Sequence, residues 1–265
     1  MAVNRYKKLL SDTLIFAIGT FSSKVLVFLL MPLYTRVLTT ADYGSVDLIM
    51  QTGNLLFPVV TAGIVSGVVR YGLDSAYDKK DVFSTGLKVT LIGLGILFVL
   101  MPLFALLPFL QGIDTLVYLY VFVVMSAMRY LTSQFVRSIG YVKLYAFDGI
   151  LSTVMLVIFN VLFLVVFRWG VAGYVLATIA ADVCSTLFLF VTAELYKYVD
   201  FKHTNKKVAR SMMRYSVPLI PNNIFWWITN VSDRYILTGF CGTSENGLYA
   251  AAQKIPTIIL SLIHI

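Results

Sequence analysis

Charged side chains interrupt several strongly apolar segments of this sequence. Lys24 lies near the middle of the first apolar segment, Arg129 lies in the fourth and Asp182 in the sixth. Charges inside a membrane are costly, face the interior of a helix bundle or a wet cavity, and mark binding or ion pathways. Lysine and arginine both bind phosphate. The sequence therefore predicts a cationic cavity for an anionic substrate, with Lys24 as an anchor. The alternative is a buried structural pair of Lys24 with Asp182 or Asp47.

Two further positions extend this cationic set. Arg129, Ser133 and Arg137 are spaced four residues apart, so on a helix they share one face and form a basic stripe. Lys88 lies near the start of the third segment, where its long side chain can reach the membrane surface instead of a cavity. Asp182 is either a proton or cation site or the counter-ion of Lys24, and we favour the counter-ion.

A polar stripe crosses the second apolar segment. Asp47, Gln51, Asn54 and Pro58 follow the spacing of one helix face. We expect this face to line the cavity, where its side chains can bind sugar hydroxyls. The alternative is hydrogen bonding between helices, which such residues also provide in membranes.

A second polar face is predicted in the segment that starts at Tyr215. Aromatic rings beside amide side chains suit sugar stacking, although tryptophan also gathers at membrane interfaces. An alternative role for Arg234 is a local pair with Asp233. The candidate substrate-binding residues of this segment are Asn222, Trp226, Asn230 and Arg234.

Eight apolar segments must position these residues. A membrane-spanning helix needs about 20 apolar residues, and the segments are residues 14–34, 43–69, 83–110, 115–136, 149–167, 171–193, 215–240 and 247–265. The chain is 59% hydrophobic and only 13% charged, with a mean hydropathy of +0.85. Soluble domains carry about 25% charged residues, so we exclude a soluble enzyme. The strand alternation of a membrane barrel is missing, and the fold class is therefore an all-α, multi-pass membrane protein.

The basic residues predict the orientation. One side of the predicted membrane carries 14 of the 21 Lys and Arg residues, whereas the other carries only Arg36, Arg168 and Arg234. Because basic loops stay in the cytoplasm, we expect the N-terminus to be cytoplasmic. The net charge of +8 is thus an orientation signal, and nucleic acid is not an expected partner.

A short motif occurs twice. Thr40 to Gly44 and Thr243 to Gly247 both read Thr-x-acid-x-Gly, at an offset of 203 residues that contains six predicted helices. This pattern indicates a parallel repeat of the kind found in transporters. We expect a six-helix lobe at residues 1–200, a basic cytoplasmic linker at 201–214 and the first two helices of a second lobe at 215–265.

Two complete copies of such a repeat exceed 265 residues, so we expect the sequence to be a C-terminally truncated fragment. Residues 260–265 are what the transposon end used in sequencing-library adaptors would encode. We therefore expect the natural sequence to end near Ile259 and adaptor read-through to follow it. The alternative is a chance apolar terminus.

Residues 32–38 (PLYTRVL) and 42–44 (DYG) resemble the first two helices of bacterial polysaccharide flippases. These are the Wzx-like members of the multidrug/oligosaccharidyl-lipid/polysaccharide (MOP) exporter superfamily. Residues 215–218 (YSVP), 233–237 (DRYIL) and 247–249 (GLY) resemble the start of that family's second lobe. The resemblance implies a MATE-like, two-lobed carrier of the bacterial inner membrane. Such a carrier flips an undecaprenyl-pyrophosphate-linked oligosaccharide to the periplasmic leaflet by alternating access.

Several alternatives remain at this point. A lipid II flippase or a MATE-type multidrug exporter of the same superfamily fits the same pattern. A membrane-embedded glycan polymerase or acyltransferase fits less well, because the predicted periplasmic loops are short. No phosphate-binding loop, zinc-protease motif or nucleophile elbow occurs. We expect no enzyme activity, cofactor or metal; the expected partners are the lipid-linked oligosaccharide, membrane lipids, a polysaccharide polymerase and glycosyltransferases.

Overall fold

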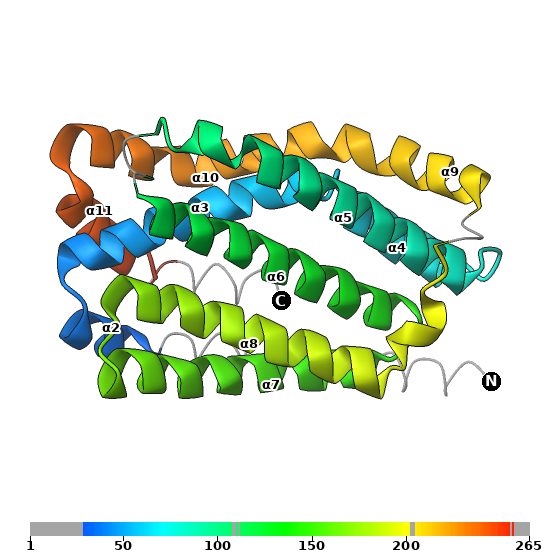
Figure 1. Cartoon of the computed structure of the whole chain (residues 1–265), viewed down its shortest axis with the longest axis horizontal. Coiled ribbons are helices and arrows are strands. Elements are labelled where there is room, and N and C mark those ends of the chain that lie inside the picture. Colours follow the sequence, from blue (N-terminus) through cyan, green and yellow to red (C-terminus); the bar gives the residue numbers. More distant parts are fainter. Residues whose placement is uncertain (1–28, 108–109, 111, 202–204, 255, 257–265) are drawn as a thin grey trace.

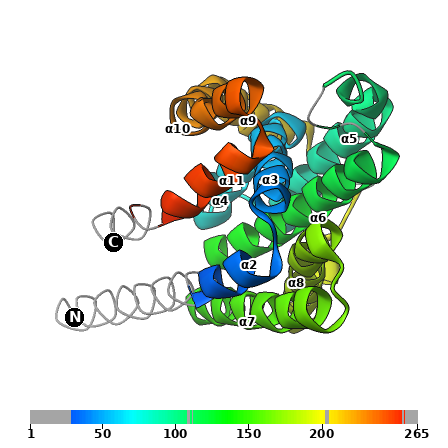
Figure 2. The ribbon, with the colours of Figure 1, turned by 90° about the vertical axis from the view of Figure 1, so that its left-hand side faces the viewer.

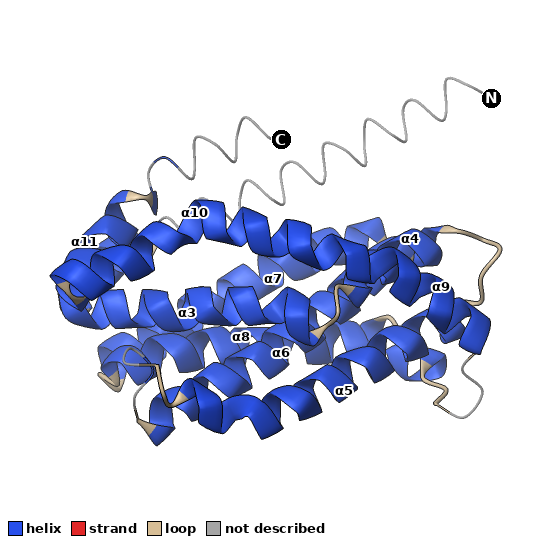
Figure 3. Ribbon diagram, turned by 90° about the horizontal axis from the view of Figure 1, so that it is seen from above, coloured by secondary structure: helices blue, strands red, loops and turns tan. Residues whose placement is uncertain are grey.

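The computed structural model describes residues 29–107, 110, 112–201, 205–254 and 256, and this part of the chain is helical with short turns and no strands (Figure 3). The prediction of an all-α fold is therefore confirmed. In chain order, the α-helices are α2 (Met31–Val37), α3 (Thr40–Val60), α4 (Ile64–Leu73), α5 (Lys79–Phe104), α6 (Ile113–Ser138), α7 (Val142–Asn160), α8 (Gly170–Thr192), α9 (Lys206–Ser216), α10 (Ile220–Cys241) and α11 (Thr243–Ala252). The π-helix η2 (Val161–Val166) continues α7, and the 3₁₀ turns are η3 (Leu195–Tyr198) and η4 (Val217–Leu219).

Four helices in the described residues are long and apolar enough to cross a membrane. They are α5, α6, α7 with η2, and α8, and the bent pair α3–α4 makes a fifth if it counts as one span. Only 22–39% of the most apolar part of each helix is buried in the protein. The outer faces carry exposed residues such as Ile92, Phe98 and Leu187, as a lipid-facing surface requires.

The count differs from the eight predicted segments for two reasons. Most of the first segment and the end of the eighth lie outside the described residues. Helix α10 is long enough to span but less apolar than the four that qualify, because it contains polar residues such as Asn222 and Asn230.

The second predicted segment, residues 43–69, is a broken helix. Helices α3 and α4 meet at a bend of 58°. Pro58 lies just before the bend, where it lacks the backbone donor that a continuous helix needs. Gly63 has a φ of +62°, a left-handed conformation that favours glycine. The residues on both sides of the bend are mainly apolar, so hydropathy alone predicted one continuous span.

The helices pack side by side in one bundle (Figures 1 and 2), and apolar clusters hold them together. One joins α4, α5, α6, α8 and α9 through Val68, Phe83, Phe135, Leu189 and Met212. A second cluster joins α3, α5, α6 and α8, and its buried members include Leu56, Leu97, Phe122 and Val175. A smaller third cluster around Tyr34, Tyr43 and Ala250 joins α2 and α3 to α11. Because α3 contributes to the second cluster, the polar stripe of α3 is held in a fixed orientation.

The predicted linker at residues 201–214 is largely the helix α9. Asn205 caps this helix by accepting a hydrogen bond from the backbone N–H of Lys207 at 3.0 Å. Val208 and Met212, one turn apart, are buried against the bundle, while Lys206 and Arg210 are exposed. Figure 1 shows α9 at one end of the molecule and α2 with α11 at the opposite end. The linker therefore packs on the bundle through an apolar face that its basic composition obscures.

Candidate functional site

The two Thr-x-acid-x-Gly motifs lie against each other at the start of α3 and α11. Thr40 Oγ1 and Ser244 Oγ are 2.6 Å apart, and the side chain of Asn246 donates to the carbonyl oxygen of Gly44 at 3.1 Å. We call this contact, formed by residues 40–44 and 243–247, the α3–α11 junction. It joins segments that are about 200 positions apart in the sequence.

The junction is reciprocal. A Cβ atom on Gly44 would overlap the carbonyl oxygen of Thr243, and a Cβ atom on Gly247 would overlap that of Thr40. The offset of 203 residues that relates the motifs exchanges these two contacts. Self-complementary contacts of this kind are typical of two-fold related surfaces. The glycines are therefore required for the close approach of the two helices.

A buried ion pair lies about one helical turn beyond the junction. The guanidinium of Arg234 on α10 donates to the carboxylate of Asp47 on α3 and, at 2.6 Å, to the amide oxygen of Gln253. The side chains of Arg234 and Asp47 are only 10% and 8% exposed. One oxygen of Asp47 and Nε of Arg234 are buried without a hydrogen bond in the described part of the chain.

The neighbouring Asp233 does not take Arg234 as its side-chain partner. Its carboxylate accepts hydrogen bonds from the hydroxyl of Tyr249 and from the backbone N–H of Arg234. The alternative of a local Asp233–Arg234 pair is therefore replaced by a pair between distant helices.

The polar stripe of α3 forms a chain of contacts. The Gln51 amide donates to Asp47 at 3.5 Å, and the Asn54 amide donates to Gln51 at 3.3 Å. The indole of Trp227 donates to the backbone carbonyl of Gln51 at 2.9 Å. Asn54 is exposed, whereas Asp47 is buried. The stripe thus leads from the buried ion pair to an exposed amide.

A second polar network lies between α6, α7 and α8. Every nitrogen of the Arg129 guanidinium is used: Nη1 contacts Asp182 at 3.3 Å, Nε contacts Ser185 at 3.2 Å and Nη2 contacts Ser152 at 2.7 Å. Ser126 donates to the other oxygen of Asp182 at 2.6 Å. The Arg129 side chain is 34% exposed and that of Asp182 is 7% exposed.

Asp148 completes this network. Its buried carboxylate accepts a hydrogen bond of 2.6 Å from Ser185, which in turn accepts one from Arg129. The network therefore holds two carboxylates and a single guanidinium. The sequence favoured Lys24 as the partner of Asp182, and Lys24 lies outside the described residues. Within them, Asp182 pairs with Arg129.

Other predicted site residues lie apart from these clusters. Lys88 is exposed on α5 and belongs to neither cluster. Asn222, Trp226 and Asn230 are exposed on α10, where Asn230 donates to the backbone carbonyl of Trp226 at 2.6 Å. Trp226 is 67% exposed. This face of α10 is available for a ligand or for further protein.

Sequence reasoning missed several members of both clusters. Asp148 and Ser152 are four residues apart on α7, and Asp182 and Ser185 are three apart on α8. Such spacing places each pair on one helix face. The sequence therefore contained a signal, but a pattern of only two residues did not stand out. Gln253 and Tyr249 show no pattern of their own and are identified only by their contacts.

Outside the predicted spans, an exposed ion pair closes the turn after α8. Lys197 donates a hydrogen bond to Glu194, and this lowers the pKa of the Glu194 carboxyl. Both side chains are more than half exposed, so the pair contributes little to stability.

The described residues offer no metal centre. They contain no group of three or more His, Cys, Asp or Glu side chains placed to hold a metal ion. Cys184 and Cys241 are both free thiols. The contacts observed at the two clusters are ion pairs and hydrogen bonds.

Comparisons with known proteins relate the chain to one family and one fold. The family described as "Polysaccharide biosynthesis protein" matches residues 9–265. A MATE family multidrug transporter of the MOP superfamily is similar in its outward-facing conformation, with 15% identity, a TM-score of 0.68 and coverage of 93% of this chain and 60% of that one. A MATE family multidrug transporter of the MOP superfamily in an inward-facing conformation has 17% identity and a TM-score of 0.59, with coverage of 89% of this chain and 61% of that one. A crystal structure of MATE in complex with MaL6 has 16% identity and a TM-score of 0.66, with coverage of 93% of this chain and 60% of that one.

The chain spans about 60% of the length of these transporters. No curated protein matched it. At these identities the structural matches establish the fold, and they agree with the MATE-like architecture expected from the sequence.

Proposed function

The chain belongs to the polysaccharide biosynthesis protein family, and on that premise we propose that it is part of a lipid-linked oligosaccharide flippase. The flippase moves an undecaprenyl-pyrophosphate-linked oligosaccharide from the cytoplasmic to the periplasmic leaflet of a bacterial inner membrane. It works by alternating access between two lobes, and its product enters surface polysaccharide synthesis. No catalytic step is required.

The observation that carries this proposal is the junction between the two repeat copies. A carrier of this kind needs two bodies that meet on a surface able to separate. The α3–α11 junction is built from hydrogen bonds and glycine contacts, and the ion pair behind it joins α3 to α10. Polar contacts of this kind can exchange for water when the lobes separate. The two larger apolar clusters lie away from this surface, and only the small cluster around Tyr34, Tyr43 and Ala250 crosses it.

The polar faces of α3 and α10 suit a glycan. Gln51 and Asn54 offer amide donors and acceptors, and exposed Trp226 offers a ring face with Asn230 one turn away. We propose that these side chains line the cavity together with Asn222, and that Lys24 and Lys88 supply positive charge toward the pyrophosphate, whereas the charge of Arg129 is balanced by Asp182. A multidrug exporter of the same fold has no comparable need for a line of sugar-binding amides.

The orientation proposed from the basic residues places α9 in the cytoplasm and the α3–α11 junction in the periplasm. The lipid-linked substrate is then built by cytoplasmic glycosyltransferases and handed to a periplasmic polymerase. Both are proposed partners, with membrane lipids as the solvent.

Deletion of the gene from its source strain tests the function. We expect the loss of surface glycan, with the lipid-linked oligosaccharide accumulating in the cytoplasmic leaflet, and recovery of both on expression of the intact gene. Resistance to cationic drugs serves as the comparison measurement. A deletion strain with normal surface glycan and increased drug sensitivity would instead establish the exporter alternative.

A further inference from the structure

Helix α9 carries all of its basic residues on one side. Three of them follow each other at intervals of four residues and the fourth is adjacent to the first, so they share one helix face. All are exposed, whereas Val208 and Met212 on the opposite side are buried against the bundle. We call this row the basic face, and its members are Lys206, Lys207, Arg210 and Arg214.

Contacts with α4 fix the direction in which the basic face points. The hydroxyl of Tyr71 on α4 donates to the backbone carbonyl of Ser211 at 3.1 Å. The guanidinium of Arg70 lies 4.4 Å from the centre of the Tyr215 ring, which is a cation–π contact. Because these contacts hold the neighbouring sides of α9, the basic face stays turned away from the bundle.

The start of α9 lies at the level where α5 leaves the membrane. Helix α5 has 26 residues, and about 20 residues cross the apolar core of a bilayer. About six residues of α5, or about 9 Å of helix, therefore extend beyond this core. The polar start of α5 (Lys79, Lys80 and Asp81) identifies the end that extends. The backbone N–H of Asn205 donates to the Asp81 carboxylate at 3.1 Å, so α9 starts in the headgroup layer, where lipid phosphates lie.

The protein does not balance the positive charge of the basic face. Helix α9 contains no acidic residue, and none of the four side chains forms a hydrogen bond or ion pair with the described residues. Lys197, in the turn before α9, differs because it pairs with Glu194. The orientation of a membrane protein depends on how many basic residues lie on each side, and it does not require that they share one helix face. The orientation signal alone therefore does not account for the row.

We propose that the basic face binds the anionic headgroups of phospholipids in the cytoplasmic leaflet. Lysine and arginine side chains near a membrane surface each attract anionic lipid, and Arg214, the member farthest from the start of α9, reaches the headgroup layer through its long side chain. Since η4 joins α9 directly to α10, the bound lipid also anchors the cytoplasmic end of α10. The leaflet follows from the orientation proposed above, whereas the lipid binding does not depend on the transported substrate.

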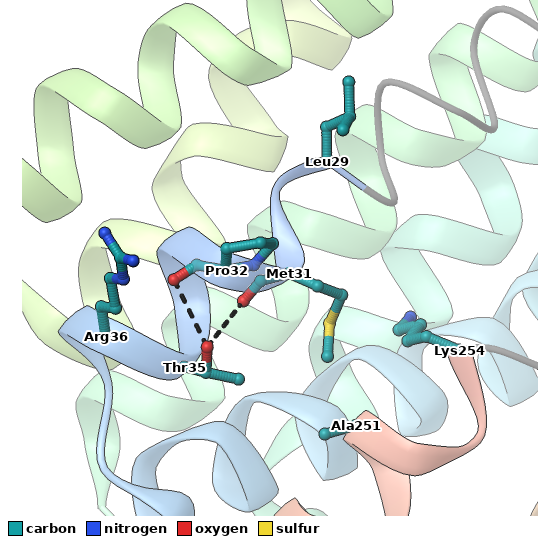
Figure 4. A pocket seen from close by; sticks show the side chains of 7 residues that line it. All are labelled: Leu29, Met31, Pro32, Thr35, Arg36, Ala251 and Lys254. Carbon is teal, nitrogen blue, oxygen red and sulfur yellow. Dashed lines mark hydrogen bonds between the residues drawn. The ribbon is translucent and has the colours of Figure 1, made fainter.

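A second group of cations provides a comparison. Arg36 and Lys254 line a pocket between α2 and the end of α11, together with apolar residues such as Leu29 and Ala251 (Figure 4). These two cations come from different segments and form no row, and Lys254 has an interaction of its own in the protein. We therefore expect an anionic phospholipid to prefer the basic face.

Lipid binding to the purified full-length protein in detergent tests the proposal. Native mass spectrometry compares phosphatidylglycerol, which is anionic, with phosphatidylcholine, which has no net charge. We expect Lys206→Gln and Arg210→Gln each to weaken phosphatidylglycerol binding about five-fold. The quadruple variant K206Q/K207Q/R210Q/R214Q is expected to weaken it more than about fifty-fold.

Lys197→Gln is the matched control, because it removes an exposed positive charge from the same predicted side that already has an acidic partner. We expect it to change phosphatidylglycerol binding less than about two-fold. Arg210→Lys keeps the charge and is expected to bind like the wild type. Thermal unfolding without added lipid checks the fold, and it is expected to be the same in all of these variants because the basic-face side chains are exposed.

Equal binding of phosphatidylglycerol and phosphatidylcholine by the wild type overturns the proposal, as does undiminished phosphatidylglycerol binding by the quadruple variant. A loss in Arg36→Gln as large as that in the quadruple variant also overturns it, because the lipid then binds in the pocket between α2 and α11. If the quadruple variant loses glycan export while its phosphatidylglycerol binding is unchanged, the proposal is overturned in favour of an acidic protein partner.

Discussion

Asp47 and Arg234 form a buried ion pair although 187 positions separate them in the chain. Their side chains are about nine-tenths buried, and the pair joins α3 to α10. Two charges in such a setting stabilise the structure only while each has its partner. The pair therefore ties together two helices that are far apart in the sequence.

We expect Arg234→Gln to destabilise the protein by about 3–5 kcal/mol, because it leaves the Asp47 carboxylate buried without a counter-charge. Asp47→Asn is expected to cost a similar amount, because it leaves the Arg234 guanidinium buried without a carboxylate partner. Chemical unfolding in detergent measures both. The double variant Asp47→Asn/Arg234→Gln carries no buried charge at these positions.

The double variant is the control for this prediction. Its loss of stability is expected to be clearly smaller than the sum of the two single losses, since the residues act as a coupled pair. Additive losses would show that the two charges do not interact.

Gly44→Ala is expected to destabilise the protein by about 1–3 kcal/mol, because its methyl group would overlap the carbonyl oxygen of Thr243 and force α3 and α11 apart. Gly247→Ala is expected to behave alike, because its contact with Thr40 is equivalent. Thermal unfolding measures both losses. Gly95→Ala on α5 is the matched control, since no atom lies near its added methyl group. Equal tolerance of Gly44→Ala and Gly95→Ala contradicts the close approach.

The sequence predicted the elements well and their partners poorly. Hydropathy located the helices, and the five-residue match between Thr40–Gly44 and Thr243–Gly247 identified two motifs that the structure brings into contact. Helix periodicity also placed Asp47, Gln51 and Asn54 on one face. Such periodicity describes a single helix, so it contains no information on which distant residue faces that stripe.

The partners of Arg129 illustrate the same limit. Its spacing from Ser133 and Arg137 indicated a basic stripe, but Asp182 and Ser152 reach it from two other helices. The break after Pro58 was missed because the residues on both sides are equally apolar. Long-range pairing and local backbone geometry, rather than composition, determine these features.

Arg129→Gln is expected to cost about 3–5 kcal/mol of stability, because Asp182 and Asp148 then share a buried site with no cation. Arg129→Gln/Asp182→Asn is expected to recover a large part of this loss. Chemical unfolding in detergent gives the stability, and surface glycan gives the function. A recovered double variant without glycan export would show that the charges of Arg129 and Asp182 act in transport as well as in folding. Failure of Asp182→Asn to recover any stability contradicts the pairing.

Reporter fusions test the orientation. The start of α6 and the start of α9 lie at opposite ends of the molecule (Figure 1). We expect a reporter at Ile113 to read periplasmic and one at Lys206 to read cytoplasmic, because basic residues accumulate on the cytoplasmic side. The reverse result would place the α3–α11 junction in the cytoplasm.

The most direct test of the account is a reversible cross-link across the α3–α11 junction. Thr40 and Ser244 have hydroxyl oxygens 2.6 Å apart, so Thr40→Cys/Ser244→Cys can form a disulfide after small side-chain rotations. The native thiols at Cys184 and Cys241 are first replaced by serine, and each single cysteine variant serves as a control. If the two repeat copies must separate there during transport, oxidation abolishes glycan export and reduction restores it, while the single variants export normally. Full export by the oxidised, fully cross-linked protein would contradict alternating access at this junction.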